Sequence, residues 1–479
     1  MELYIIPLVF ALVAAISPKN LVKYIGLAGA VASLVATLAK AVVFQSGSTV
    51  LVYDPELVTS FGMTFKMGYD GMGLFMVLLT NALVPIILLS NLNRSVANER
   101  GFNAMVLLMQ FALVGVFTAL DGILFYVFWE LTLVPIFLIA LWYGATDSKK
   151  SLIKFFIYTF VGSLAMLLSL MALGTQAADF SHESLVAVQL TAKSACWIMG
   201  GFFLAFAIKI PLFPFHTWQP ATYTNAPMAG TMLLSGLMLK MALFGMIRWM
   251  IPLAPEALGE MQFLVITLGL IGIVYAAIIA IKQNDIKRIF AFASISHVGL
   301  IAAGIMLFDT ATLSAAFVQM LNHSLVAVGL FLAAGILEDR FGTRDISQMG
   351  GVAKVAPRFA FWFAVIAFAS VSVPFTSGFI GEFLLLKSLY NYNWVVGLIA
   401  GTTLVFGAVY TFRAYQVSMN GAGTTHPFKD LTWNETAAFF LITILIVFFG
   451  VYPQAIINFV GPSLENLKGL IQASNNLVP

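Results

Sequence analysis

Apolar residues fall into long runs that are separated by short polar segments. Runs of spanning length lie near residues 3–17, 21–44, 72–92, 103–119, 121–143, 152–174, 195–217, 226–251, 262–282, 287–307, 312–337, 359–390, 394–418 and 434–460. Each is close to the roughly 20 residues that a helix needs to cross a bilayer. The pattern predicts an all-α integral membrane protein of about fourteen transmembrane helices.

One segment departs from this pattern. Residues 49–66 (TVLVYDPELVTSFGMTFK) alternate between apolar and polar positions around Asp54–Pro55, which favours a surface hairpin. We expect residues 1–102 to form helices one to three with this hairpin. Two five-helix repeats should follow at 103–251 and 262–418, and helix fourteen with a tail at 419–479.

Composition agrees with a lipid environment. The chain is 61% hydrophobic and only 9% charged, and its mean hydropathy is +0.97. Ordinary soluble domains carry roughly 25% charged residues. The net charge of +3 does not suggest nucleic acid as a partner, because the basic residues lie in short loops. The first apolar run lacks the basic leader of a signal peptide, so we expect it to be retained as a helix.

Redox and metal chemistry are not expected on this chain. Cys196 is its one cysteine, which excludes an internal disulfide or a cysteine-ligated cluster held by this chain alone. The histidines, at 182, 216, 297, 323 and 426, show no helical metal-binding spacing. There is also no phosphate-binding loop or dinucleotide fingerprint.

Basic residues predict the orientation. They concentrate in the loops that follow odd-numbered helices: Lys19, Lys23, Arg94, Arg100, Lys149, Lys150, Lys154, Lys282, Lys287, Arg288, Arg340, Arg344, Lys354 and Arg358. The other loops contain mainly Lys66, Lys193 and Arg248. Because positive loops stay in the cytoplasm, both termini are expected on the outer side.

Six titratable residues interrupt the apolar runs near their centres. They are Glu130, Lys209, Lys240, His297, His323 and Glu382. A charge at mid-bilayer costs about 2.5–3.5 kcal/mol on insertion scales, so these side chains should face the protein interior.

Two of these charges lie beside helix breakers. Pro211 and Pro214 follow Lys209, and Pro374 precedes Glu382. Interrupted helices in matching positions of two halves indicate an ion site in transporters built from repeats. Helices seven and twelve match if helices four to eight repeat as nine to thirteen. Each repeat would contain five helices, an odd number, so the second repeat would cross the membrane with the opposite orientation to the first.

These residue types suit proton transfer. Carboxylate, imidazole and amine groups can each bind and release a proton, whereas arginine cannot. We therefore predict a relay in which a Glu130–Lys209 pair passes charge to Lys240 and then, through the two histidines, toward Glu382.

Structural interpretations remain open at each position. Glu130 and Lys209 could be a buried ion pair that orients two helices, and the histidines could be hydrogen-bonded packing residues. Glu382 could face an aqueous boundary. Lys387 is better explained as an interfacial lysine whose ammonium reaches toward water.

Several stretches carry a family resemblance: YDGMGLFMVLLT at 69–80, FWELTLVP at 128–135, KIPLFPFHTW at 209–218, APMAGTMLLSGLMLKM at 226–241, DIKRIFAFASISHVG at 285–299 and FIGEFLLL at 379–386. On these motifs the chain resembles the antiporter-like subunits of bacterial respiratory complex I, the proton-pumping NADH:quinone oxidoreductase. Glu382 is typical of the M type, because related subunits tend to have lysine there.

The resemblance implies a fold of fourteen helices with outward termini. It also implies that Glu130, Lys209, Lys240, His297 and His323 are proton-channel residues. The chain departs from the family after HTW. Ala221, Tyr223 and Asn225 stand where an acid, a histidine and a second acid are usual, which puts the role of those polar groups in doubt.

The resulting hypothesis is a proton-translocating complex I subunit in the bacterial inner membrane. NADH, FMN, iron–sulfur clusters and quinone would then be held by partner subunits, with L-type and N-type subunits flanking this chain. Alternatives are a subunit of a sodium/proton antiporter or of a membrane-bound hydrogenase. The absence of a carboxylate cluster favours protons over sodium.

Overall fold

The computed structural model describes residues 1–53, 62–145, 148–421 and 428–475. The first part contains α1 (Glu2–Ile16), α2 (Val22–Val43), α3 (Gly71–Ser90), α4 (Glu99–Thr118), α5 (Gly122–Leu131), α6 (Leu133–Tyr143) and α7 (Lys149–Gly174). The middle contains α8 (His182–Val186), α9 (Ala192–Lys209), η1 (Phe215–Trp218), α10 (Gln219–Asn225), α11 (Met228–Leu233), η2 (Leu234–Met238), α12 (Leu239–Gly245), η3 (Met246–Met250), α13 (Ile251–Leu253) and η4 (Pro255–Ala257). The last part contains α14 (Leu258–Lys282), α15 (Ile286–Ile305), α16 (Thr310–Phe341), η5 (Ile346–Gln348), α17 (Val352–Val355), α18 (Pro357–Ser370), α19 (Ser377–Tyr392), α20 (Trp394–Met419), α21 (Trp433–Val451) and α22 (Gln454–Asn475).

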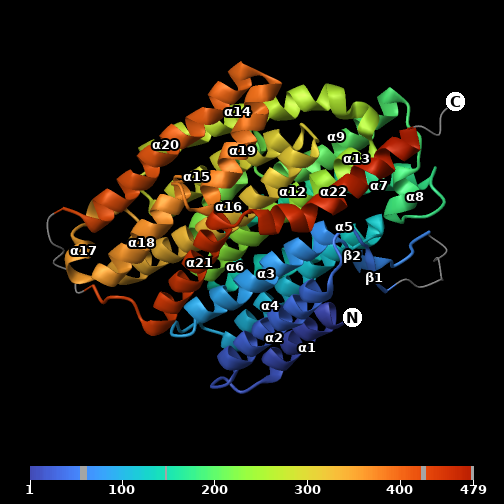
Figure 1. The fold of residues 1–479 in the computed structure, drawn as a ribbon. Helices are drawn as coiled ribbons and strands as arrows, with labels where there is room; N and C mark the ends of the chain where they lie inside the picture. The colour runs from blue at the N-terminus through green and yellow to red at the C-terminus, as the bar shows by residue number, and fades with distance from the viewer. Residues whose placement is uncertain (54–61, 146–147, 422–427, 476–479) are drawn as a thin grey trace.

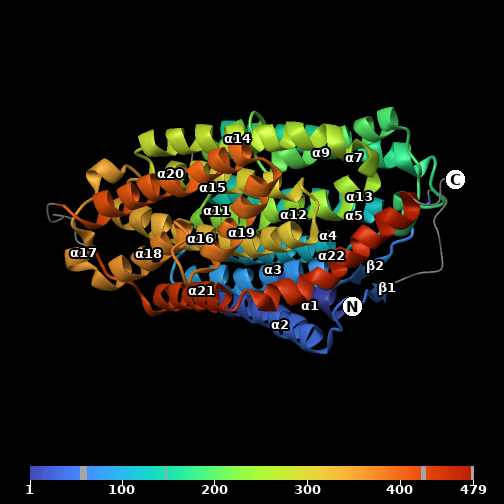
Figure 2. The ribbon, with the colours of Figure 1, turned by 45° about the horizontal axis from the view of Figure 1, so that its top comes forward.

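Most of these helices lie alongside one another in an elongated bundle (Figures 1 and 2). Within the described residues, 12 helices are long and apolar enough to cross a membrane, and α1 and α18 are shorter apolar helices. The predicted all-α membrane class is therefore confirmed. The count of fourteen and the inverted repeat remain predictions.

Two helical stretches form the centre of the bundle. Residues Met228–Leu253 are all buried inside the protein, and α16 is buried from Thr312 to Leu337, whereas most residues of α2, α20 and α21 are not buried. A fully buried helix needs no polar face, so polar residues on the central helices must find partners within the protein.

The two ends of the bundle differ. One end carries α17 and most of the ion pairs that link loops, among them Arg94–Asp339 and Lys287–Glu338. We call it the charged end. The other end carries α8, the β-strands, the N-terminus and the C-terminal end of α22 (Figure 1).

A short antiparallel ribbon pairs β1 (Val50–Tyr53) with β2 (Met67–Tyr69). The first strand lies within the predicted hairpin segment, but the second begins at Met67, just after that segment ends. Residues 54–61, which include the predicted Asp54–Pro55 turn, lie outside the described part of the chain.

Both predicted helix interruptions are present. Helix α9 ends at Lys209, and the chain resumes helical structure at Phe215 after Pro211 and Pro214. Helix α18 ends at Ser370 and α19 begins at Ser377, with Pro374 between them. Proline lacks the backbone N–H that the helix would need and clashes with the preceding turn, which explains both breaks.

The segment expected as a C-terminal tail contains another helix, α22. It crosses α3 and α16 (Figure 1). At the crossing, the backbone N–H of Gly71 donates a 2.9 Å hydrogen bond to Ser463 Oγ. A Cβ atom at residue 71 would lie 2.3 Å from the Phe459 carbonyl oxygen, so the approach requires glycine.

Candidate functional site

Lys240 lies at the centre of the buried stretch Met228–Leu253. Two π-helical segments, η2 and η3, flank the α-helical turn that carries it. Such π-bulges are rare in proteins overall, and those that occur are often at functional sites. The Lys240 ammonium donates a 2.6 Å hydrogen bond to the Ser235 carbonyl and lies 2.7 Å from Nδ1 of His323.

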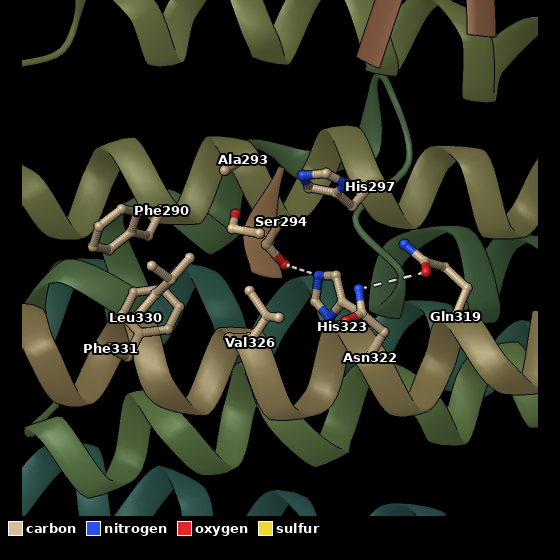
Figure 3. A pocket seen from close by; sticks show the side chains of 12 residues that line it. Phe290, Ala293, Ser294, His297, Gln319, Asn322, His323, Val326, Leu330 and Phe331 are labelled. Carbon is tan, nitrogen blue, oxygen red and sulfur yellow. Dashed lines mark hydrogen bonds between the residues drawn. The ribbon is translucent and has the colours of Figure 1, made fainter. Parts of the chain in front are cut away.

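His323, on α16, joins Lys240 to α15. Its Nε2 atom lies 3.0 Å from Ser294 Oγ (Figure 3). An ammonium group can only donate, so in this arrangement Nδ1 of His323 accepts and Nε2 carries the hydrogen toward Ser294. Both nitrogens of the His323 ring therefore have hydrogen-bond partners, which fix the orientation of the ring. A group that relays protons needs a partner on each side.

A second hydrogen-bonded group contains His297 and Glu382. Nδ1 of His297 lies 2.7 Å from Glu382 Oε1, and Nε2 lies 3.1 Å from the Tyr410 hydroxyl. Gln319 Nε2 donates a 3.0 Å bond to the same carboxylate oxygen. Glu382 is 1% exposed, so it does not face an aqueous boundary in this chain.

A small cavity separates the two histidines. Their ring centroids are 6.5 Å apart. Both rings line a cavity of about 20 Å³, together with Ser294, Gln319 and Asn322 (Figure 3). A cavity of this size has room for about one water molecule, and Ser294, Gln319 and Asn322 offer that water hydrogen-bonding partners. Lys240, His323, His297 and Glu382 thus form one buried line with a single short gap.

Lys209 is buried at the C-terminal end of α9, away from this line. Its ammonium makes no hydrogen bond to the described residues. It lies 5.5 Å from the ring centroid of Trp129 and 5.8 Å from that of Phe155, within the range of cation–π attraction.

Glu130 and Lys209 form no direct ion pair among the described residues. Glu130 lies near Ser163, but its charge still interacts with that of Lys209, so their pairing in a relay stays a prediction. Phe206 packs 5.4 Å from Trp129 and would contact any side chain atom added at Gly245. Aromatic side chains therefore fill the space between α9 and the Lys240 helix.

A buried ion pair that the sequence did not predict lies at the end of the bundle that carries α8 and the β-strands. Arg248 had been expected in a loop, but it is on η3, and its Nη2 atom lies 2.6 Å from Asp70 Oδ1. His182 Nε2 bonds the Arg248 carbonyl at 2.8 Å. Burial, aided by the nearby Arg248 charge, lowers the pKa of His182 to about 4. His182 is therefore neutral at ordinary pH.

The sequence also did not identify Ser294, Gln319, Tyr410 or Trp129 as neighbours of the relay. Ser294 precedes His297 by three residues and Gln319 precedes His323 by four, spacings that place each pair on one helix face. Trp129 is next to Glu130 in sequence. Tyr410 could not be found this way, because only tertiary packing brings α20 to His297.

The described residues contain no group of three or more His, Cys, Asp or Glu side chains that could hold a metal ion. The side chains of Lys240, His323, His297 and Glu382 are groups that can bind and release protons.

Comparisons with known proteins identify a family of membrane proteins. Residues 119–407 match the family described as NADH:quinone oxidoreductase/Mrp antiporter, TM. The chain is 35% identical to NADH-quinone oxidoreductase subunit M of Rickettsia conorii over 455 residues, covering 93% of this chain and 92% of that one. It is 32% identical to NADH-ubiquinone oxidoreductase chain 4 of Arabidopsis thaliana, covering 97% and 96%.

Solved structures show the same fold. A chain of respiratory complex I from Thermus thermophilus matches with a TM-score of 0.91 and 29% identity, over 98% of this chain and 99% of that one. A chain of the Mrp complex from Dietzia matches with a TM-score of 0.90 at 20% identity, over 98% of each chain. The site and fold thus define a membrane protein with a buried line of titratable side chains. The chain belongs to the NADH:quinone oxidoreductase/Mrp antiporter membrane family, in which it groups with subunit M.

Proposed function

We propose that this chain is the M-type proton-translocating subunit of an NADH:quinone oxidoreductase. The observation that carries the proposal is the buried line from Lys240 through His323 and His297 to Glu382. Each member can bind and release a proton, and the contacts of 2.7 Å at both ends are short enough for transfer.

The chain has a non-redox role in this proposal. NADH, FMN, iron–sulfur clusters and quinone belong to partner subunits, and L-type and N-type subunits flank this chain. Energy arrives through contacts with those neighbours. The basic loops of the charged end favour a cytoplasmic location for that end, with both termini on the outer side of a bacterial inner membrane.

The test is NADH-driven proton pumping by the assembled complex in proteoliposomes. Lys240→Ala removes the amine between Ser235 and His323, so pumping and coupled turnover should be lost. Lys387→Ala is the matched control, because Lys387 is an exposed lysine on α19. If Lys240→Ala pumps as well as the control at equal assembly, the relay is not the conducting path.

A second candidate function is supported by the Mrp likeness: a subunit of a sodium/proton antiporter driven by ion gradients. A third, a subunit of a membrane-bound hydrogenase, predicts a nickel-containing partner. Purification in native lipid separates the three. Co-purifying flavin and iron–sulfur subunits support the oxidoreductase, and their absence from an intact assembly supports the antiporter.

A further inference from the structure

The ammonium of Lys209 lies beside two aromatic rings and makes no hydrogen bond to the described residues. Its Nζ atom lies over the Trp129 indole, 5.5 Å from the ring centroid, and over the Phe155 ring at 5.8 Å. Both distances are within the range of cation–π attraction. We call Trp129 and Phe155 the ring pair.

Three helices bring these side chains together in the protein interior. Lys209 ends α9, Trp129 lies on α5 and Phe155 lies on α7. The lysine is 2% exposed and the two aromatic residues are each 1% exposed. Because the dielectric constant is low at such a buried position, a ring face attracts a cation more strongly there than at a hydrated surface.

Both rings of the pair are braced by further aromatic side chains. Trp129 packs against Phe206, three residues before Lys209 on α9, with ring centroids 5.4 Å apart. Phe155 packs against Trp218 at 4.9 Å. The Trp218 indole N–H donates a 2.8 Å hydrogen bond to the backbone carbonyl just before Lys209. The two rings and the backbone of the lysine are therefore fixed relative to one another.

Glu130 offers the same lysine a different kind of partner. It follows Trp129 directly on α5 and lies near Ser163, and its charge interacts with that of Lys209 without a direct ion pair. Glu130 is half-buried, whereas Trp129 is buried. The carboxylate thus acts on the ammonium from beyond direct contact, while the rings lie at the distance at which they attract a cation.

Aromatic packing alone would explain part of this arrangement. A neutral lysine amine would pack among rings much as an apolar side chain does, and the rings would then contribute only burial. Its N–H groups would still be buried without a partner, which is costly. A ring face is the kind of partner that favours an ammonium group where no hydrogen-bond acceptor is present.

We propose that Trp129 and Phe155 are positioning residues that hold the protonated form of Lys209 by cation–π attraction. This inference rests on the proposed function, with Lys209 as a proton carrier. The proton stays on Nζ and no bond to either ring forms. Because the rings favour the ammonium over the neutral amine, weakening their attraction reduces the fraction of Lys209 that carries a proton and slows the relay.

A series of fluorinated tryptophans tests the attraction at nearly constant ring shape. Fluorine withdraws electron density from the indole face, so tryptophan with one, two or three fluorine atoms attracts a cation progressively less. Each analogue replaces Trp129 in the assembled complex by stop-codon suppression. The melting temperature of the complex in detergent, followed through this chain, should fall in steps with the number of fluorine atoms.

Lys209→Met is the background that isolates the ammonium. Methionine is an unbranched side chain without a charge, so in this background the same series should leave the melting temperature unchanged. A stepwise fall in both backgrounds would show that fluorine disturbs ring packing and not cation–π attraction. No fall in either background would also overturn the proposal.

Trp249 is the matched control for the ring itself. It is fully buried and packs against Phe125 with ring centroids 5.1 Å apart. In the described part of the chain, the lysine and arginine side chains that lie over rings lie over other ones. Fluorination of Trp249 should therefore shift the melting temperature less than fluorination of Trp129, and equal shifts would contradict the proposal.

NADH-driven proton pumping provides a second measurement. Trp129→Phe keeps a weaker ring and Trp129→Leu removes the ring, so pumping should fall by about threefold and about tenfold, respectively. Phe155→Leu, which removes the more distant ring, should give an intermediate loss. Trp249→Phe and Trp249→Leu are the matched changes, compared at equal assembly. Equal losses at residues 129 and 249 would assign Trp129 to packing alone.

The two proposals fail in different ways. If Lys240→Ala pumps normally, the proposed function fails, while the melting temperatures still report whether the rings hold the Lys209 ammonium. If Lys240→Ala abolishes pumping but fluorination of Trp129 has no more effect than fluorination of Trp249, only the role of the ring pair is wrong.

Discussion

At the scale of single residues, the position of a titratable group in an apolar run predicted that the group is buried. It did not predict which side chain the group contacts. Lys240, His323, His297 and Glu382 all face the interior, as the cost of exposing them to lipid requires. Lys209 is also buried: two aromatic rings lie within cation–π range of its ammonium, and the Glu130 charge interacts with it without a direct ion pair. The sequence contains no information on which of several buried groups a flexible lysine will reach.

His323 provides the sharpest residue-scale prediction. His323→Gln keeps a hydrogen-bonding side chain, but an amide cannot bind and release a proton as an imidazole ring does. Proton pumping should therefore fall by at least about tenfold. Coupled NADH oxidation in proteoliposomes measures the loss. Ser324→Ala, a change at the next residue of α16 that does not line the cavity, is the comparison for local packing. Normal pumping by His323→Gln would show that the line does not pass through this ring.

At the scale of elements, helix ends and helix breaks position the charges. Asp70 caps the N-terminus of α3 by accepting a 2.9 Å bond from the Gly73 N–H, and the same carboxylate binds Arg248 on η3. The cap thereby ties α3 to the helix that carries Lys240. The sequence predicted the breaks at Pro211, Pro214 and Pro374 because proline acts locally, but the Asp70–Arg248 contact joins segments far apart in the chain.

Breaking this ion pair should destabilise the chain. Arg248→Met leaves the Asp70 carboxylate buried and unpaired, at a cost of about 3–5 kcal/mol. We expect reduced assembly of the complex, measured by the amount of this chain in purified membranes. Asp70→Asn combined with Arg248→Met removes both charges and should restore part of the assembly. If the single and double variants assemble equally, the pair contributes little.

At the scale of the whole molecule, one end of the bundle carries a cluster of ion pairs, and the other is held by the Asp70–Arg248–His182 contacts. His182 lies outside the membrane-spanning helices. Its pKa is lowered to about 4 by burial first and then by Arg248. Below an ordinary pKa of about 6.5 the unfolded chain binds a proton that the folded chain does not, so stability falls as the pH falls toward 4.

This linkage predicts a pH-dependent stability. Between pH 7 and pH 5, His182 should reduce the free energy of unfolding by about 2 kcal/mol. Thermal unfolding of the purified complex in detergent, followed through this chain, measures the change. His182→Gln cannot titrate and should lose less stability over the same range. An equal loss in both proteins would show that His182 is not the titrating group.

The sequence alone determined that the protein lies in a membrane, where its charged loops gather, where its helices break and which titratable groups must face inward. These properties follow from local composition and from the cost of placing charge in lipid, so each can be derived one segment at a time. Only the tertiary structure decided that Lys240 contacts His323, that His297 contacts Glu382 and Tyr410, and that aromatic rings hold Lys209. These contacts depend on the relative placement of helices distant in the sequence, which packing across the whole bundle sets and which no local pattern records.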